Sequence, residues 1–109
     1  MEKPSLYFWI SDGCAWIRVT GRGDVRNATE VKELSKKAIS GRGVREFVVD
    51  FTECHEIDST FLGIISGIAL RLRELRVPRG VRLVNCSDRT RMLLGNLGLD
   101  ELFQIEENR

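Results

Sequence analysis

A nearly continuous apolar run that changes into a helical pattern constrains this chain more than any other feature. The run covers Phe47–Phe51 and is interrupted only by Asp50. Such runs are typical of strands that are buried on both faces of a mostly parallel sheet. The polar segment Thr52–Asp58, which we expect to be a loop, is followed by apolar residues with the period of an α-helix. The sequence therefore predicts a central strand followed by an amphipathic helix.

The predicted helix has two different faces. Its core stripe contains Phe61, Ile65, Ile68, Leu72 and Leu75. The opposite face has small residues in its first two turns and contains Ser59, Gly63, Ser66, Gly67, Leu70 and Glu74. Each glycine costs a helix about 1 kcal/mol relative to alanine. These glycines are either tolerated, or packed closely against a neighbouring element, or part of a flat docking surface with Ser59 at its rim.

The junction Asp58-Ser59-Thr60 favours a helix start, because side-chain oxygens of these residue types accept hydrogen bonds from unpaired backbone N–H groups. Ser59 is therefore expected at the N-terminus of the helix, just beyond the C-terminal end of the central strand. Open α/β sheets tend to build their sites at that edge. From the residues alone, Ser59 could also be nothing more than a helix cap.

The preceding part of the chain predicts a β-hairpin and a first helix. The strand-like segments 6–10 and 15–19 flank a tight-turn signal at residues 11–13, and residues 20–24 break the strand pattern. We expect the helix to start at Asn27 with a capping-box-like pair and to stop at the glycines around Arg42. Its narrow apolar stripe contains Val31, Leu34 and Ala38.

The following part predicts a strand, a third helix and a short last strand. The strand covers Val81–Cys86, and the last strand lies near Gln104. Ser87 or Asp88 caps the third helix, and Gly98 is its expected C′ residue. The inward residues of that helix are Thr90, Leu93, Leu94 and Leu97. The predicted order is ββαβαβα(β), an α/β fold in which helices pack on a mixed, mostly parallel sheet of four or five strands. We expect one domain over residues 1–109.

Composition excludes several classes of protein. With 42% apolar residues, 30% charged residues and a net charge of +1, strong attraction to nucleic acid or anionic membranes is not expected. No apolar stretch approaches the roughly 20 residues that span a bilayer, and we expect no signal peptide. Cys14, Cys54 and Cys86 form no CxxC pair, which favours a reducing cytoplasm. With a single histidine, His55, we expect no metal site and no cofactor.

Four motifs form a pattern that extends along most of the chain. The most specific motif is the aspartate–serine junction with its small-residue helix, IDSTFLG at residues 57–63. The supporting motifs are GRGD at 21–24, VVDF at 48–51 and LGLDELF at 97–103. In their order and spacing, these four motifs resemble the STAS domain, and within it the bacterial anti-sigma factor antagonists, over essentially the whole chain.

The resemblance assigns roles to individual residues. In such antagonists, the serine directly after the junction aspartate is phosphorylated by a serine kinase that also serves as the anti-sigma factor, and this role falls on Ser59. The implied partner-binding face comprises Asp24, Asp58, Ser59, Thr60, Gly63, Ser66, Gly67 and Leu70. The chain departs from the family at Phe61, where glycine is usual, and at Thr60, where a smaller serine or alanine is common.

The implied function is that of a cytoplasmic binding module rather than an enzyme. The unmodified form would dock on the kinase or anti-sigma factor, and phosphorylation would end the contact. A phosphatase is a further candidate partner, whereas nucleic acid and membrane insertion are not expected. The alternative is a STAS accessory subunit of a transporter or lipid-transport system, which docks constitutively through the same helix face.

Three other constellations have ordinary explanations. Cys54, His55 and Ser59 could suggest a thiol or serine nucleophile, but adjacent strand residues point to opposite faces and the GxSxG pattern is absent, so we predict no catalytic residue. Asp24 is also a common type of turn residue, and Asp50 lies either at a strand end or beside a partner. The arginines at 71, 73, 76, 79 and 82 suggest a solvated face more than an acidic-partner or lipid-headgroup site.

Overall fold

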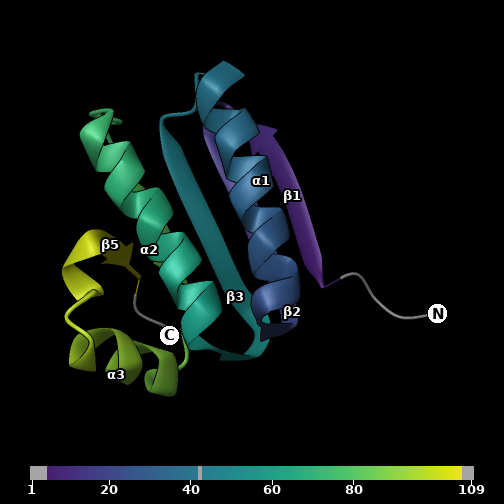
Figure 1. Cartoon of the computed structure of the whole chain (residues 1–109), viewed down its shortest axis with the longest axis vertical. Helices are drawn as coiled ribbons and strands as arrows, with labels where there is room; N and C mark the ends of the chain where they lie inside the picture. The colour runs from purple at the N-terminus through teal and green to yellow at the C-terminus, as the bar shows by residue number, and fades with distance from the viewer. Residues whose placement is uncertain (1–4, 42, 107–109) are drawn as a thin grey trace.

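The computed structural model describes residues 5–41 and 43–106, which form a five-stranded sheet in the order β1-β2-β3-β4-β5 (Figure 1). The strands are β1 (Leu6–Ser11), β2 (Cys14–Gly23), β3 (Glu46–Ile57), β4 (Val81–Val84) and β5 (Phe103–Ile105). The first pair is antiparallel and the others are parallel. Helices α1 (Val25–Gly41), α2 (Ser59–Glu74) and α3 (Asp88–Asn96) connect successive parallel strands, and a 3-10 turn, η1 (Asp100–Leu102), precedes β5. This arrangement confirms the predicted fold class.

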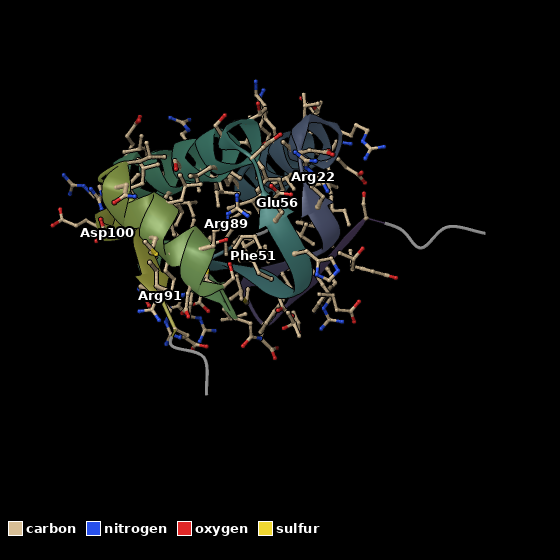
Figure 2. All side chains as sticks on the ribbon, turned by 90° about the horizontal axis from the view of Figure 1, so that it is seen from below. Arg22, Phe51, Glu56, Arg89, Arg91 and Asp100 are labelled. Carbon is tan, nitrogen blue, oxygen red and sulfur yellow. The ribbon has the colours of Figure 1, made fainter. Side chains whose placement is uncertain are left out.

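Helices α1 and α2 lie side by side on one face of the sheet (Figures 1 and 2). Right-handed crossovers between strands in sequential order place the connecting helices on the same face. The hydrophobic core fills the space between these two helices and the sheet. Its buried side chains include Ile17 and Val19 of β2, Phe47 and Val49 of β3, and the predicted helix stripe of α2 as far as Leu72. The prediction that the Phe47–Phe51 strand is central is therefore confirmed.

Strand β3 is longer than the sequence pattern predicts. The expected loop at Thr52–Asp58 is wrong, because the strand continues to Ile57. Strand β2 likewise continues through Thr20–Gly23, where the sequence predicts a break. The two extensions pair with each other in parallel, across register shifts between Arg18 and Thr20 and between Gly21 and Arg22. Backbone pairing between distant segments thus keeps these polar residues extended without burying most of their side chains.

Helix α1 begins two residues before the predicted start at Asn27. Asp24 precedes the helix, and its Oδ1 accepts a hydrogen bond from the backbone N–H of Arg26 at 3.0 Å. In the opposite direction, the backbone N–H of Asp24 donates a hydrogen bond to Oδ1 of Asn27 at 2.9 Å. The reciprocal pair that caps the helix is therefore Asp24 with Asn27. Val31 and Ala38 are buried as predicted, whereas Leu34 is half-buried and Arg42 lies outside the described residues.

The later elements follow the prediction with small differences. Ser87 caps α3 by accepting from the backbone N–H of Thr90 at 3.1 Å, and Gly98 has a φ of +70° just beyond the helix. Strand β4 ends at Val84 rather than at Cys86. Leu75 and Leu97, predicted to face inward, are 43% and 53% exposed. Each is the C-cap residue of its helix, so the chain leaves the helical path where the apolar stripe would have continued.

Candidate functional site

The junction between β3 and α2 places Ser59 as predicted, at the first residue of α2. The capping function belongs to the preceding residue, because Oδ1 of Asp58 accepts from the backbone N–H of Phe61 at 2.9 Å. Ser59 is exposed, and its hydroxyl has no hydrogen-bond partner among the described residues. The interpretation of Ser59 as only a helix cap is therefore wrong. Its hydroxyl group is free at the positive end of a helix dipole.

A backbone hydrogen bond connects this junction to β2. The N–H of Asp58 donates to the carbonyl of Gly23 at 2.9 Å, and Gly23 pairs with Ile57 in the sheet. Asp24 and Asp58 consequently precede two helices that start at the same edge of the sheet (Figure 1). The carboxylate of Asp24 also pairs with Arg26, with 3.2 Å between Oδ2 and Nη2. The hydrogen bond from the Arg26 side chain holds the pKa of Asp24 below its usual range.

Phe61, the main departure from the family pattern, points into the core. Its side chain is fully buried, and its ring meets that of Phe51 edge to face at a centroid distance of 6.3 Å. The ring also lies against Gly23: an added Cβ there would lie 3.0 Å from Cγ of Phe61 and 2.8 Å from Cγ2 of Ile57. The large ring therefore occupies interior space that only a glycine in β2 leaves open, and it leaves the outer face of α2 unchanged.

The outer face of α2 is mostly as predicted. Thr60, Gly63, Gly67 and Leu70 are exposed. Ser66 is not, and its assignment to an accessible partner-binding face is wrong: it is only 7% exposed, and its Oγ has no hydrogen-bond partner within the described ranges. The buried arc of α2 is wider than the predicted stripe. It also includes Leu62 and Ala69, which lie on the same side of the helix as Ser66.

The two glycines of α2 do not serve close packing within the chain. A Cβ atom added to Gly63 or to Gly67 would meet nothing within 4 Å. Both residues line a groove of about 320 Å³ between α1 and α2. The close-packing interpretation of these glycines is therefore wrong, and the interpretations as tolerated glycines and as a docking surface remain.

A second hollow, which the sequence reasoning did not identify, lies at the same edge between the end of β3 and α3. It has a volume of about 460 Å³, and Figure 2 labels two of its charged residues, Glu56 of β3 and Arg89 of α3. The sequence contained a signal for this hollow. A helix is predicted directly after β4, and β4 is parallel to β3, so the start of α3 and the end of β3 lie at the same edge of the sheet.

The residues considered for catalysis do not form an activated pair. Cys54 donates from Sγ to the carbonyl of Glu56 at 3.4 Å, and burial raises the pKa of its thiol, which keeps it protonated. His55 is its neighbour on the strand and is exposed. Within residues 5–41 and 43–106, no group of three His, Cys, Asp or Glu side chains could hold a metal ion. No helix in that part of the chain is long and apolar enough to cross a membrane.

Several of the remaining charged residues form ion pairs. Asp50 has a partner rather than only a strand-end position, since Nε of Arg18 lies 3.2 Å from its Oδ2. The predicted arginine cluster is divided: Arg71 pairs with Glu74 on α2, and Arg82 with Glu46 in the sheet. Within this cluster, Arg71 and Arg82 therefore have acidic partners close to their guanidinium groups.

Comparison with known proteins agrees with this architecture. A search of curated proteins finds no significant sequence match. Solved structures with the same fold include a putative anti-sigma factor antagonist from Thermotoga maritima, with 18% identity and a TM-score of 0.79 over 94% of this chain and 86% of that one. Another is the phosphorylated form of the Bacillus cell fate determinant SpoIIAA, with 22% identity and a TM-score of 0.70 over 94% and 92% of the two chains.

A third is a sulfate transporter family protein from Wolinella succinogenes, with 16% identity and a TM-score of 0.69 over 85% of this chain and 73% of that one. At these identities the likeness concerns the fold. The family itself is identified by the sequence, because the model of the STAS domain matches residues 9–109. The chain therefore belongs to the STAS domain family.

Proposed function

We propose that this chain is a cytoplasmic regulatory module of the anti-sigma factor antagonist type, whose docking is controlled by phosphorylation of Ser59. The observation that carries the proposal is the free, exposed hydroxyl of Ser59 at the start of α2, with Asp58 as the helix cap and Phe61 turned inward. The proposed partner is a serine kinase that also serves as the anti-sigma factor and holds ATP and Mg²⁺ itself. A phosphatase would restore the unmodified form.

The local electrostatics are compatible with a modification that leaves the fold intact. A phosphoserine at a helix N-terminus meets unpaired backbone N–H groups and the positive end of the helix dipole. The adjacent carboxylate of Asp58 opposes it by repulsion between like charges. Because Ser59 is exposed and makes no hydrogen bond within the described residues, the phosphate would break no native contact. The change would be one of surface charge.

That change in charge is large enough to act as a switch. Phosphorylation adds roughly −1.5 to −2 charges at pH 7. A partner that covers Thr60, Gly63 and Gly67 would also cover Ser59 and would have to bury this anion. Burying an unpaired charge commonly costs several kcal/mol, and a loss of about 3 kcal/mol already weakens binding about a hundredfold.

A second candidate function uses the same helix face without the switch. A sulfate transporter family protein has the same fold, which favours the alternative of an accessory subunit that docks constitutively. In that case ATP and a kinase would not change docking, and Ser59 would stay unmodified.

The two candidates are separated by incubating the protein with a serine kinase of the anti-sigma factor type from the same organism, with ATP and Mg²⁺, and mapping phosphate by mass spectrometry. We expect phosphate on Ser59 in the wild type and in Thr60→Ala, and none in Ser59→Ala. Ser59→Asp should bind the kinase about a hundredfold more weakly than Ser59→Ala. Phosphate on Thr60, or no phosphate at all, would contradict the switch and favour constitutive docking.

A further inference from the structure

We propose that the groove between α1 and α2 binds an acidic, amphipathic helix of a protein partner. This inference rests on the proposed docking role of α2 and adds the chemistry of the segment that docks there. It concerns a surface beside Ser59, not Ser59 itself.

The groove has an apolar floor and extends along both helices. Its floor includes Ile39 of α1 together with Ile64 and Ile68 of α2. An adjoining hollow of about 330 Å³ shares Ile39 and Arg71 with it and continues to Leu75, which is 43% exposed. Figure 1 shows the two helices side by side over this length. The surface therefore offers an elongated apolar strip rather than a closed pocket.

Glycines on α2 keep this strip open. Gly63 and Gly67 are four residues apart, so they lie on one row of the helix surface, one turn from each other. A methyl group at either position would project into unoccupied space. The chain thus accepts two unfavourable helix residues without a packing gain of its own. Their absent side chains let another helix approach α2 closely, with its apolar residues between those of α1 and α2.

The rim of the groove is basic. Lys32 and Lys36 of α1 and Arg71 of α2 line it, and no carboxylate among the described residues does. Both lysines are exposed, and neither forms an ion pair within the described part of the chain. Arg71 pairs with Glu74 at 3.6 Å, but both side chains are more than half exposed, so this pair is weak and can be exchanged.

The charge pattern selects the occupant. A helix with one apolar stripe would cover the isoleucine floor, and carboxylates beside the stripe would meet the two lysines, which are themselves one turn apart. Such complementarity raises the association rate and rejects basic partners. The other possible occupants are a second copy of this chain and an anionic lipid surface. The experiment below distinguishes both from the acidic helix.

The test uses the isotope-labelled chain and a synthetic 18-residue helical peptide with leucine at the i, i+3, i+4 and i+7 positions and glutamate at the others. NMR titration should shift the backbone signals of α1 and α2 around Lys36, Gly63 and Gly67. Gly67→Leu, which fills the groove, and Lys32→Glu/Lys36→Glu should each weaken binding at least tenfold. Two matched controls, Gly95→Leu on α3 and Lys37→Glu on α1, should stay within twofold of the wild type.

Several outcomes would overturn the proposal. These are the absence of shifts, shifts on another surface, equal binding of a peptide with lysine in place of glutamate, and preferential binding of vesicles that contain anionic phospholipid. Shifts of the same residues with protein concentration alone would assign the groove to a second copy. Because neither a kinase nor phosphate is present, failure here leaves the Ser59 switch untouched, and failure of the switch leaves this result standing.

Discussion

Gly23 of β2 and Phe61 of α2 are matched in size, because a Cβ atom at position 23 would lie 3.0 Å from Cγ of the phenylalanine ring. The same atom would lie 2.8 Å from Cγ2 of Ile57, and both neighbours are buried. A side chain at Gly23 would therefore have to displace the first turn of α2, which carries Ser59. The absence of a side chain at Gly23 thus allows the first turn of α2, with Ser59, to lie where it does.

We accordingly expect Gly23→Ala to lower the free energy of unfolding by about 1–3 kcal/mol, the usual range for overpacking a core. Urea denaturation measures this change. Gly41→Ala is the matched control, because a Cβ at the end of α1 would meet nothing within 4 Å, and it should stay within about 0.5 kcal/mol of the wild type. Equal effects of the two substitutions would show that the approach of Phe61 is not limiting.

Two substitutions at the start of α2 should show which residue caps the helix. Asp58→Ala removes the acceptor for the backbone N–H of Phe61 and should destabilise the protein by about 0.5–2 kcal/mol. Ser59→Ala removes no hydrogen bond within the described residues and should change stability by less than about 0.5 kcal/mol. Thermal denaturation of both variants provides the comparison. A loss in Ser59→Ala as large as that in Asp58→Ala would mean that the serine also caps the helix.

The glycines of the groove should behave in the opposite way to Gly23. Gly63→Ala and Gly67→Ala place a methyl group in open space inside a helix, so each should stabilise the protein by roughly 0.5–1 kcal/mol. Chemical denaturation of the two single variants and of the double variant tests this expectation. Destabilisation by either one would reveal a packing contact that the open groove does not contain.

Stability should fall in acid partly through Asp50. Burial raises its pKa, but hydrogen bonds from Thr52, Asn85 and Arg18 together outweigh burial and hold the pKa below its usual range. The ionised carboxylate therefore favours the folded state. This contribution is complete above the unfolded-state pKa, near pH 4, and is lost as the pH falls through the lower folded-state pKa.

Asp50→Asn tests this linkage. The difference in the free energy of unfolding between the wild type and Asp50→Asn should be largest near pH 7 and should shrink as the pH is lowered below about 4. Taking the difference cancels the contributions of the other carboxylates, which both proteins share. A difference that does not vary with pH would contradict the role of the Asp50 charge.

The thiols should be unreactive in the folded state. Burial raises the pKa of Cys86 to about 11, and burial together with the charge of Glu46 raises that of Cys14 to about 11. Near pH 8, the thiolate population of each should be about a hundredfold below that of an ordinary cysteine. Alkylation by iodoacetamide, followed by mass spectrometry, should be correspondingly slow until urea unfolds the chain. Rapid labelling of native Cys86 would contradict its burial.

Local patterns in the sequence determined the elements around the site. The apolar run Phe47–Phe51, the helical spacing from Phe61 to Leu72 and the junction at Asp58 and Ser59 each act within a few residues, so their effects can be read without the rest of the chain. The structure agrees with all three. The position of Ser59 at the start of α2 needed nothing more.

Tertiary structure decided what depends on distant neighbours. Thr52–Ile57 is a strand because Thr20–Gly23 pairs with it, and no local propensity of a polar segment encodes a partner thirty residues away. Ser66 is buried because the covered arc of α2 is wider than its apolar stripe. The open groove beside Gly63 depends on how far α1 lies from α2. Periodicity tells which face of a helix is apolar, but only packing determines how much of that helix is covered and where space is left for a partner.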